Sequence, residues 1–532
     1  MGTTVNQSST LPDDVEALKA LLRERDAQLA AKLAHIDQLE HHVQVLTKLV
    51  FGKKSEKREA VASERQQGHL FLAAMLAQAE RVAQEKSATS VVELVREPSS
   101  PKPKARRKAF PDHLPRVRTI FDLKPEQKLC CGKAMSPMGE ELTRELERVE
   151  ISVVHEIVRK KYCCRTCQEH VKVAAGPDRV IDKGLLGSGF LAHVIAERFG
   201  QHMPYYRLEK KYAAEGLDLS RAVMCRSALQ CAEILQPIWQ SMAESVRGKS
   251  IVHTDDTPVV LKEASHGEPA TGRLWIYRSL DDELVYDFTE SRSRDGPLAM
   301  LGDYAGHIQA DAFAGYDVFF APRGRAIEVG CWAHARRYFV RARDSDATLA
   351  DEALEQIGRL YAVERVAKLH GFDADGVREL RQSSARPVLA DLKEWLEVTK
   401  PKVLEKSPLA KAIHYARANW TALVRYVEDG RLNLDNLPAE RALRAVAVGR
   451  KNWLMVGNVR GGKAAAVLYT LVQTCKEIGV VPQTYLRDVL LRIGSETDVT
   501  KLTPHGWKQH FAGQVEQELS RAEQVIRAAL SR

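Results

Sequence analysis

The sequence has little that would place it in or across a membrane. None of its apolar runs approaches the roughly 18–20 residues that a bilayer-spanning helix needs. Its first ten residues, MGTTVNQSST, lack the basic and then apolar order of a secretory signal. These absences argue against a membrane-spanning or exported protein, and we therefore expect a cytoplasmic protein without a membrane partner.

Cysteine is also scarce, with nine in 532 residues, and it is unevenly distributed. Five of the nine fall between residues 130 and 167, whereas the other four, Cys225, Cys231, Cys331 and Cys475, are scattered through apolar stretches. Because a cytoplasmic chain is a poor place for disulfides, the cluster is interpreted as a metal site and the scattered four as core thiols.

Charge is balanced only approximately, with 79 Lys and Arg against 70 Asp and Glu and a formal net charge of +9. The 44% of hydrophobic residues is typical of a globular protein with an ample core. The positive excess favours an anionic partner such as nucleic acid, although an ordinary basic protein would look the same. A chain of this length predicts about three or four domains.

Near the N-terminus, residues 13–50 carry a heptad pattern. Two of the d positions, Arg25 and Lys32, are charged. The a positions are all apolar: Val15, Leu22, Leu29, Ile36, Val43 and Val50. The pattern predicts a coiled coil within a helical region at 13–86, which would join copies of the chain into a homo-oligomer. The alternative is a long helix packed on its own protein.

A polar, proline-containing stretch at 87–118 follows and is typical of a linker. Its basic run, residues 102–108, would contact a phosphate backbone or only solvent. The next segment, 119–175, holds the cysteine cluster in KLCCGKAM and KYCCRTCQ. A structural Zn²⁺ takes four ligands, usually in pairs on two turns. This spacing predicts a zinc-ribbon-like domain, and a ribbon that has lost its metal is the alternative. The predicted ligands are Cys130, Cys131, Cys164 and Cys167.

Residues 183–247 are predicted to be helical. One helix ends at a turn containing Glu215 and Gly216, and a second helix begins after a cap at Ser220. This is the spacing of a helix-turn-helix, so the region is a candidate for DNA binding. The same spacing is common in any helical bundle.

From residue 249 the pattern changes to short β-rich runs. Three predicted strands are followed by a helical run and a fourth strand, which indicates a mixed α/β sheet at 249–480. The chain is helical again at about 331–430 and in a C-terminal region at 481–532. Taken together, these elements predict a multidomain α+β fold.

Three acidic residues occupy comparable positions in these elements. Asp255 is predicted to end the first strand and Asp311 the fourth, and Glu440 lies just inside a helix that Asn436 can cap and that has Pro438 in its first turn. Phosphodiester chemistry on DNA can use two divalent metals, and Mg²⁺ or Mn²⁺ prefers carboxylate oxygens. Each acid alone could cap a turn or complement a helix dipole. Together, on a basic chain, they are candidate catalytic and metal-binding residues.

Basic residues surround the last of these acids. Arg444 lies four residues after Glu440 and so on the same helix face. A carboxylate among so many cations suits a site that admits a polyanion. The candidates for DNA contact are Arg441 and Arg444 on this helix, Arg450, Lys451 and Arg460 in a predicted glycine-bearing loop, and Arg336 and Arg337 on an earlier helix.

Two further positions have metal-ligating side chains. Cys331 and His334 have the spacing of a metal pair, but no second pair lies near them in the sequence, so they are interpreted as helix core. His253, next to the first acid, is interpreted as a packed strand histidine.

Several of these blocks occur together in a known family. HTDDTPV, IQADAFAGYD, CWAHARRYF and LDNLPAERALRAVAVGRKNWLMVGNVRGG resemble the signature blocks of the insertion sequence 66 group of bacterial transposases, the TnpC type. The resemblance runs from LTKLVFGKKSEK to PQTYLRDVLLRI at 482–493, which is nearly the whole chain. It implies an RNase-H-like catalytic domain with a helical insertion and a DDE triad, carried over by motif onto Asp255, Asp311 and Glu440.

The chain departs from the family pattern at two places. Asp256 stands where the family usually has Glu after its first catalytic Asp, and it is interpreted as a neighbour of the triad. The zinc block of the family usually has two Cys-x-x-Cys pairs, and here Lys128 replaces the first cysteine. The second departure affects the predicted Zn²⁺ and not the catalytic Mg²⁺.

The resemblance implies a DNA transposase that cuts at the ends of its element and joins the freed 3′-hydroxyl to target DNA. Its partners would be double-stranded DNA and small accessory proteins of the same element. Three alternatives stay open: a metal-dependent nuclease without joining activity, a catalytically dead DNA-binding regulator, and a coiled-coil scaffold that leaves most of the chain unexplained.

Overall fold

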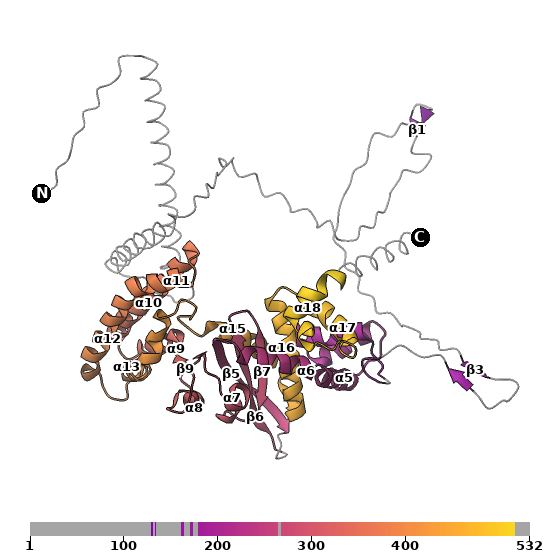
Figure 1. Ribbon diagram of the computed structural model, residues 1–532, viewed down its shortest axis with the longest axis horizontal. Helices are drawn as coiled ribbons and strands as arrows, with labels where there is room; N and C mark the ends of the chain where they lie inside the picture. Colours follow the sequence, from indigo (N-terminus) through magenta and orange to yellow (C-terminus); the bar gives the residue numbers. More distant parts are fainter. Residues whose placement is uncertain are drawn as a thin grey trace, which may run out of the picture. The chain divides into compact units, whose positions relative to one another are not determined.

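The computed structural model describes residues 179–182, 184–263 and 268–515, and the backbone of four short strands that precede them (Figure 1). The described residues fall into two compact units. One contains a β-sheet and is called the sheet unit, within Glu93–His334 and Asp435–Arg532; the other, Ala335–Leu434, is called the helical unit. The predicted coiled coil at 13–86 and linker at 87–118 lie outside the described residues.

Two antiparallel strand pairs lie within the predicted zinc-ribbon segment. β1 (Leu129–Cys130) pairs with β2 (Lys133–Ala134), and β3 (Lys161–Cys163) pairs with β4 (Val171–Val173). The side chains of the predicted zinc ligands lie outside the described residues, so the zinc site stays a prediction: Cys130, Cys131, Cys164 and Cys167.

The sheet unit is built on a six-stranded mixed sheet with the order β7-β6-β5-β8-β9, to which β10 adds beside β5. β5, β6 and β7 form an antiparallel meander, whereas β8, β9 and β10 run parallel to their neighbours. The strand bounds are Ile251–Glu263 for β5, Ala270–Ser279 for β6, Leu284–Thr289 for β7, His307–Gln309 for β8, Ile327–Val329 for β9 and Met455–Asn458 for β10.

The prediction of a mixed α/β sheet is confirmed, including three strands, then a helix and then a fourth strand. The helix is α7 (Asp295–Leu301). β9 and β10 were not predicted, because strands of three and four residues carry almost no alternation. The centre of β6, residues 274–277, is fully buried, as expected for a strand that is covered on both faces.

At β7, the outer edge of the sheet lies beside two helices, α6 (Gln236–Arg247) and α16 (Val459–Glu477) (Figure 1). The N–H of Tyr286 donates to Thr470 Oγ1 at 2.8 Å, and its carbonyl accepts from Trp239 Nε1 at 2.7 Å. Thr474 Oγ1 of α16 likewise accepts from the N–H of Leu284 and donates to the carbonyl of the same residue. Because these side chains hydrogen-bond the N–H and C=O groups of β7 that point away from β6, those groups are not available to pair with another strand.

The region at 183–247 contains helices where they were predicted. α4 (Tyr205–Ala214) ends before Gly216, whose φ of +81° is readily adopted only by glycine. Ser220 then caps α5 (Arg221–Ile234) by accepting from the N–H of Val223. The other helices of the sheet unit are α3 (Ser188–Ile195), α8 (Asp317–Phe320), α15 (Leu437–Trp453), α17 (Pro482–Arg492) and α18 (Pro504–His510).

The scattered cysteines follow the prediction with one exception. Cys231, Cys331 and Cys475 are buried, but Cys225 is exposed. The buried face of α5 runs through Met224, Ala228 and Cys231 with helical spacing, and position 225 falls beside that face. The interpretation of Cys225 as a core thiol is therefore wrong.

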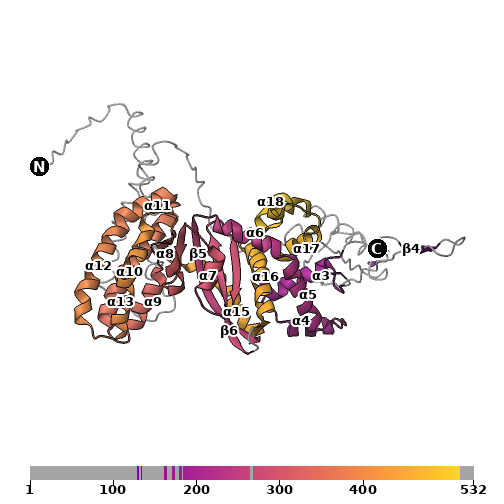
Figure 2. The same ribbon diagram turned by 60° about the horizontal axis from the view of Figure 1, so that its bottom comes forward.

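The helical unit contains α10, α12 and α13 packed side by side (Figures 1 and 2). α9 (Trp332–Ala342) leads into it from the sheet unit. The remaining bounds are α10 Ala347–His370, α11 Ala374–Leu380, α12 Arg386–Thr399, α13 Pro408–Ala418 and α14 Trp420–Val424. None of the helices in the described ranges is both long and apolar enough to span a bilayer.

A buried arginine connects the elements of the helical unit. The side chain of Arg381 is 2% exposed and binds both carboxylate oxygens of Glu364 on α10, at 2.8 and 2.7 Å. Its remaining Nη1 donates to the carbonyls of Tyr426 and Asp429 at 2.8 and 3.0 Å. One side chain thereby joins three segments of the chain.

Candidate active site

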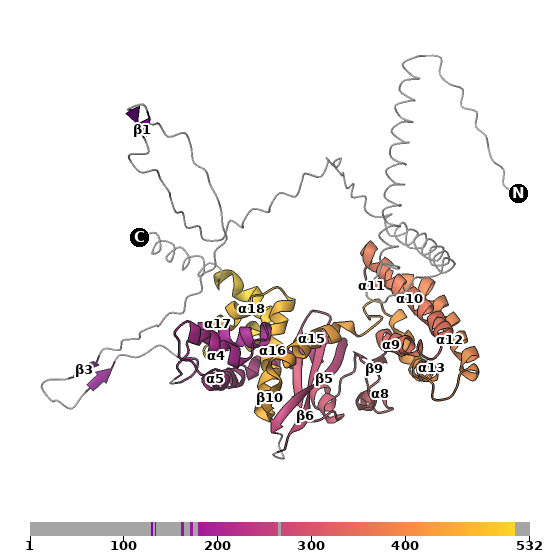
Figure 3. The same cartoon turned by 180° about the vertical axis from the view of Figure 1, so that it is seen from behind.

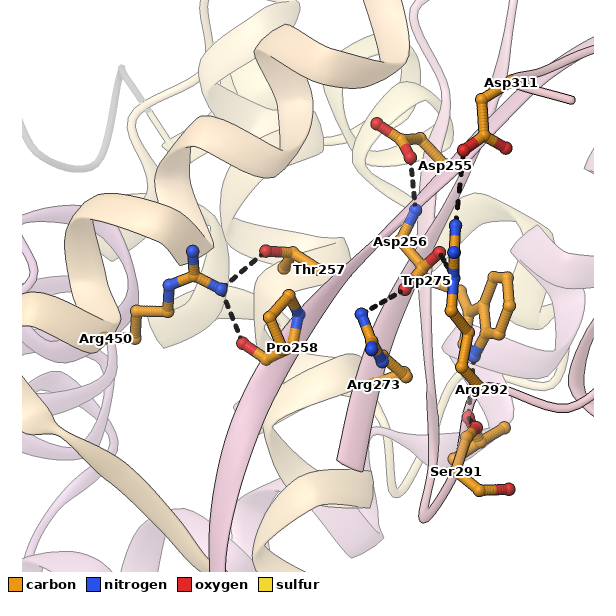
Figure 4. A network of polar contacts seen from close by, with 11 residues as sticks. Asp255, Asp256, Thr257, Pro258, Arg273, Trp275, Ser291, Arg292, Asp311 and Arg450 are labelled. Atoms are coloured by element: carbon orange, nitrogen blue, oxygen red, sulfur yellow. Dashed lines mark hydrogen bonds and ion pairs between the residues drawn. The ribbon is translucent and has the colours of Figure 1, made fainter. Parts of the chain in front are cut away.

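The sheet register brings two of the predicted acids together. β5 and β8 are parallel, and His253 and Gln309 form the last pair of their ladder. Asp255 and Asp311 each lie two residues beyond that pair, so the two strands direct them to the same edge of the sheet. Figure 4 shows both carboxyl groups above Asp256. The expectation that Asp255 ends its strand is wrong, because β5 continues to Glu263 in pairing with β6 and β10.

The third acid is positioned by the residue that precedes its helix. Asn436 Oδ1 lies 3.0 Å from His253 Nδ1, and Asn436 Nδ2 donates to the carbonyl of Thr254 at 2.8 Å. These contacts hold the start of α15 against β5 immediately before Asp255, as the view in Figure 3 shows for the two elements. Glu440 lies one helical turn further on.

Asn436 occupies the N-cap position of α15, as predicted, but its side chain does not cap the helix. The Asn436 side chain binds residues of β5 instead. The N–H of Leu437, at the start of the helix, donates to Asp435 Oδ1 at 3.1 Å. His253 is buried, and burial lowers its pKa to about 4, so it is neutral near pH 7. This agrees with the interpretation of a packed strand histidine.

The electrostatics of Asp255 show that the three acids interact. The pKa of its carboxyl group is raised from 3.8 to about 7, mainly by burial and in smaller part by the negative charges of Asp311, Asp256 and Glu440. A hydrogen bond from the N–H of Asp256 at 2.8 Å partly opposes these effects. A carboxylate in this position is costly unless a cation accompanies it.

The raised pKa of Asp255 predicts a pH-dependent cost to the metal-free fold. Between pH 3.8 and about 7 the folded chain keeps a proton that the unfolded chain has lost, so stability falls as pH rises and then levels off. Asp255→Asn has no such cost. We expect its free energy of unfolding in EDTA, measured by denaturant titration, to rise relative to wild type from pH 5 to 7, by at most about 1.4 kcal/mol per pH unit. Equal differences at pH 5 and 8 would contradict this.

Two arginines hold the neighbouring acid. Asp256 has a side chain that is 2% exposed and pairs with Arg273 at 3.0 Å and Arg292 at 2.7 Å (Figure 4). Arg292 also reaches Asp311 Oδ2 at 3.3 Å and lies over the ring of Phe313 at 4.1 Å. Asp256 is thus neutralised by the protein, in line with its interpretation as a neighbour.

Sequence reasoning missed Arg292 because nothing in the loop that follows β7 distinguishes it from other surface arginines. Its role depends on strand register: it contacts one acid on β5 and another after β8. A contact of this kind has no local sequence signal.

The basic candidates divide into exposed and engaged side chains. Arg441, Arg444 and Lys451 are exposed on α15. Arg450 donates to Thr257 Oγ1 at 2.8 Å and to the carbonyl of Pro258 at 2.6 Å, so it holds α15 to β5 (Figure 4). Arg460 pairs with Glu233 at 2.8 Å.

The predicted glycine-bearing loop for Arg450, Lys451 and Arg460 is wrong. Arg450 and Lys451 belong to the last turn of α15, and Arg460 belongs to the first turn of α16. Apolar residues keep helical spacing up to Trp453, and the helix continues with them. On α9, Arg336 is half-buried and Arg337 is exposed.

A second cluster lies next to Glu440. One ligand atom from each of Cys331, His334 and Glu440 lies within 4.8 Å of the others. Burial raises the pKa of the Cys331 thiol to about 12, which hydrogen bonds from the N–H groups of Asn436 and His334 oppose. The interpretation of Cys331 and His334 as helix core therefore holds for the buried Cys331, whereas His334 is half-buried, and it did not foresee their neighbour, Glu440.

The triad residues fit a hard divalent cation. Asp255, Asp311 and Glu440 offer only carboxylate oxygens, which are the ligands that Mg²⁺ and Mn²⁺ prefer. Their mutual repulsion, visible in the pKa of Asp255, is what a cation would relieve. Asp255 lies on β5, Asp311 just after β8 and Glu440 on α15, whose start the hydrogen bonds of Asn436 hold against β5.

Comparison with known proteins gives two family profiles that match the chain. The profile described as "Transposase IS66 family" matches residues 183–464, and the profile described as "Transposase C of IS166 homeodomain" matches residues 38–119. The chain is 32% identical over 427 residues to the uncharacterized protein y4jD of Sinorhizobium fredii, covering 76% of this chain and 83% of y4jD.

Two other proteins of the same organism are similar over long stretches. The uncharacterized protein y4hP is 29% identical over 436 residues, covering 77% of this chain and 78% of that protein. The uncharacterized protein y4qI is 28% identical over 551 aligned residues, covering 94% and 99%. With one profile spanning more than half of its residues and including all three acids, the chain belongs to the IS66 family of transposases.

Proposed function

We propose that this transposase-family protein is a metal-dependent DDE enzyme that binds the ends of its DNA element, cuts a strand there and joins the freed end to target DNA. The observation that carries the proposal is the meeting of Asp255, Asp311 and Glu440 around one edge of the sheet. Three carboxylates from three elements would repel one another without a cation to bind.

The sheet supports an RNase-H-like assignment for the catalytic domain. Its order places an antiparallel meander on one side of β5 and parallel strands on the other. The first acid lies on the central strand, the second follows its parallel neighbour, and the third is on a helix packed against β5. We interpret the helical unit, Ala335–Leu434, as an insertion between the second and third acids.

The three acidic side chains differ in how exposed they are, and we expect their roles to differ accordingly. Asp255 is the more buried anchor, whereas Asp311 and Glu440 are 21% and 24% exposed and open to solvent. When bound, a pair of divalent cations such as Mg²⁺ or Mn²⁺ would activate the attacking oxygen and stabilise the leaving one. Arg273 and Arg292 pair with Asp256, which reduces the contribution of that fourth carboxylate to the repulsion.

DNA would be held by positive charge near this edge. Arg441, Arg444 and Lys451 are exposed on the helix that carries Glu440. Phosphate contacts by such side chains supply affinity without reading sequence. Arg450 and Arg460 are engaged within the protein and are weaker candidates, and Arg336 and Arg337 remain candidates on α9.

Several further parts of the proposal rest on sequence and family. We propose that α4 and α5 read DNA, that the coiled coil at 13–86 joins copies of the chain, and that the four cysteines hold Zn²⁺. Small accessory proteins of the same element and a cytoplasmic location on the nucleoid belong to the same proposal.

A test of this function uses labelled DNA from the two ends of the element that encodes the protein, with Mg²⁺, with Mn²⁺ and with EDTA. We expect cleaved and joined products that depend on metal. Cleavage without joined product would favour the nuclease, whereas binding without cleavage would favour the regulator.

A further inference from the structure

We infer that Cys331, His334 and Glu440 form a binding site for a zinc-class divalent cation, separate from the all-oxygen site of the triad but sharing Glu440 with it. All three side chains belong to the sheet unit. The inference concerns metal binding and stands whether or not the proposed reaction is correct.

The local geometry places the three ligand atoms together. Cys331 immediately precedes α9 and His334 lies in its first turn, so one helical turn brings the two side chains to the same side. His334 Nδ1 lies 3.7 Å from Glu440 Oε1, and all three ligand atoms fall within 4.8 Å. Atoms bound to one tetrahedral Zn²⁺ lie about 3.5 Å apart, given bonds of about 2.0–2.3 Å. Small side-chain rotations therefore close the site.

The surroundings of the sulfur favour a metal-bound thiolate. Cys331 is 1% exposed, and the N–H of Asn436 donates to its Sγ at 3.2 Å. The N–H of His334 also hydrogen-bonds this sulfur. Backbone donors directed at a sulfur stabilise its negative charge and orient it, as outer partners do for metal ligands.

The donor set selects a borderline cation over a hard one. Sulfur, nitrogen and carboxylate oxygen are the ligands of Zn²⁺, whereas Mg²⁺ takes oxygen ligands and keeps its waters. Three protein ligands leave a fourth position open. The side chains of His334 and Glu440 are 19% and 24% exposed, so a cation can reach them from solvent while Cys331 anchors the site.

Sharing Glu440 has a consequence that does rest on the proposed function. A carboxylate that binds Zn²⁺ beside Cys331 is drawn away from the cations of Asp255 and Asp311. Zinc at this site would therefore compete with Mg²⁺-supported cleavage, and the competition would depend on Cys331 and His334, which lie outside the triad.

The binding test uses the full chain, freed of metal with EDTA and titrated with Zn²⁺ against a chromophoric chelator and with Co²⁺ by absorbance. The background has serine at all five cysteines of the N-terminal cluster, so that thiolate-to-cobalt absorption from this cluster does not interfere: Cys130, Cys131, Cys163, Cys164 and Cys167. We expect one site, weakened at least about 100-fold by Cys331→Ser and by His334→Gln. Cys475→Ser, which alters another fully buried thiol, is the matched control and should bind like the background.

Two results would overturn the inference: the absence of a cobalt–thiolate band in the background protein, or a band that survives Cys331→Ser. His334→Gln keeps the test decisive if Cys331→Ser does not fold, because His334 is partly exposed and circular dichroism reports the fold of each variant. In the cleavage assay, wild type should be inhibited by Zn²⁺ at least tenfold more strongly than His334→Gln, each relative to its own Mg²⁺ rate. If wild type does not cleave DNA, the proposed function fails while the metal titration still decides the site.

Discussion

Replacing Asp255 with asparagine is expected to reduce strand cleavage and joining by about 10³-fold or more, because metal ions supply several kcal/mol of transition-state stabilisation. The amide keeps the shape of the side chain and can still accept the N–H of Asp256 through its oxygen. It loses the negative charge that the cations would need. Asp311→Asn and Glu440→Gln should have effects of the same order, because the proposed site uses all three acids and the charges of Asp311 and Glu440 act on Asp255.

The measurement is a time course of cleaved and joined product on labelled element ends, with binding to the same DNA followed by gel shift. Binding should stay within a few fold of wild type, since the substitution removes no positive charge. Retained joining in Asp255→Asn would exclude Asp255 as a metal ligand.

Asp287→Asn provides a matched control in the same sheet. Asp287 lies on β7, and burial raises its pKa to about 6. Its Oδ1 accepts from the N–H of the following residue at 2.8 Å, as Asp255 Oδ1 does. The two substitutions therefore remove the same charge from similar surroundings, and only the one at Asp255 should stop cleavage.

Replacing Arg381 with methionine is expected to destabilise the helical unit by about 3 kcal/mol, toward the lower end of the cost of breaking a buried ion pair. Methionine fills much of the volume but leaves Glu364 without its bidentate partner and the carbonyls of Tyr426 and Asp429 without a donor. Hydrogen exchange read out by mass spectrometry should show faster amide exchange in α10 and α12. This measurement detects opening of the helical unit separately from unfolding of the rest of the chain.

The contrasting variant is Arg417→Met. Arg417 also binds a glutamate with two hydrogen bonds, to Glu397 at 2.8 and 2.7 Å, but these side chains are 31% and 51% exposed. Exposed pairs contribute at most about 1 kcal/mol, so this variant should exchange almost like wild type. If both substitutions accelerated hydrogen exchange equally, the burial of Arg381 would not explain its contribution to the stability of the helical unit.

Local patterns in the sequence were sufficient for the order of elements around the site. The strand run before Asp255, the helix at 295–301 and the start of α15 near Asn436 each have a pattern that lies within a few residues. The positions of the three acids along the chain followed from these patterns and from the family blocks.

What the sequence left open depends on contacts between distant residues. Asn436 was expected to cap its own helix, yet its side chain bonds Thr254, 182 residues away. Arg292 serves two acids only because β8 pairs beside β5. β10 was taken for part of a loop because four residues form a strand only when β5 is there to pair with them.

The same limit explains Cys331 and His334. A search for a metal site looks for a second pair nearby in the sequence, and here the third ligand, Glu440, follows more than a hundred residues later. Only the packing of α15 against the sheet brings it to them.

The hydrogen bond from Asn436 to Cys331 Sγ, 3.2 Å long, joins residues on either side of the helical unit. The chain leaves the sheet unit after His334 and returns at Asp435, so this hydrogen bond joins residues close to the points where it leaves and returns. Segments whose two ends meet in this way are the ones that proteins tolerate as insertions. In evolutionary terms, we expect that Ala335–Leu434, which we propose to be an insertion, could be shortened, exchanged or replaced by a brief linker while β5, β8 and α15 keep their places.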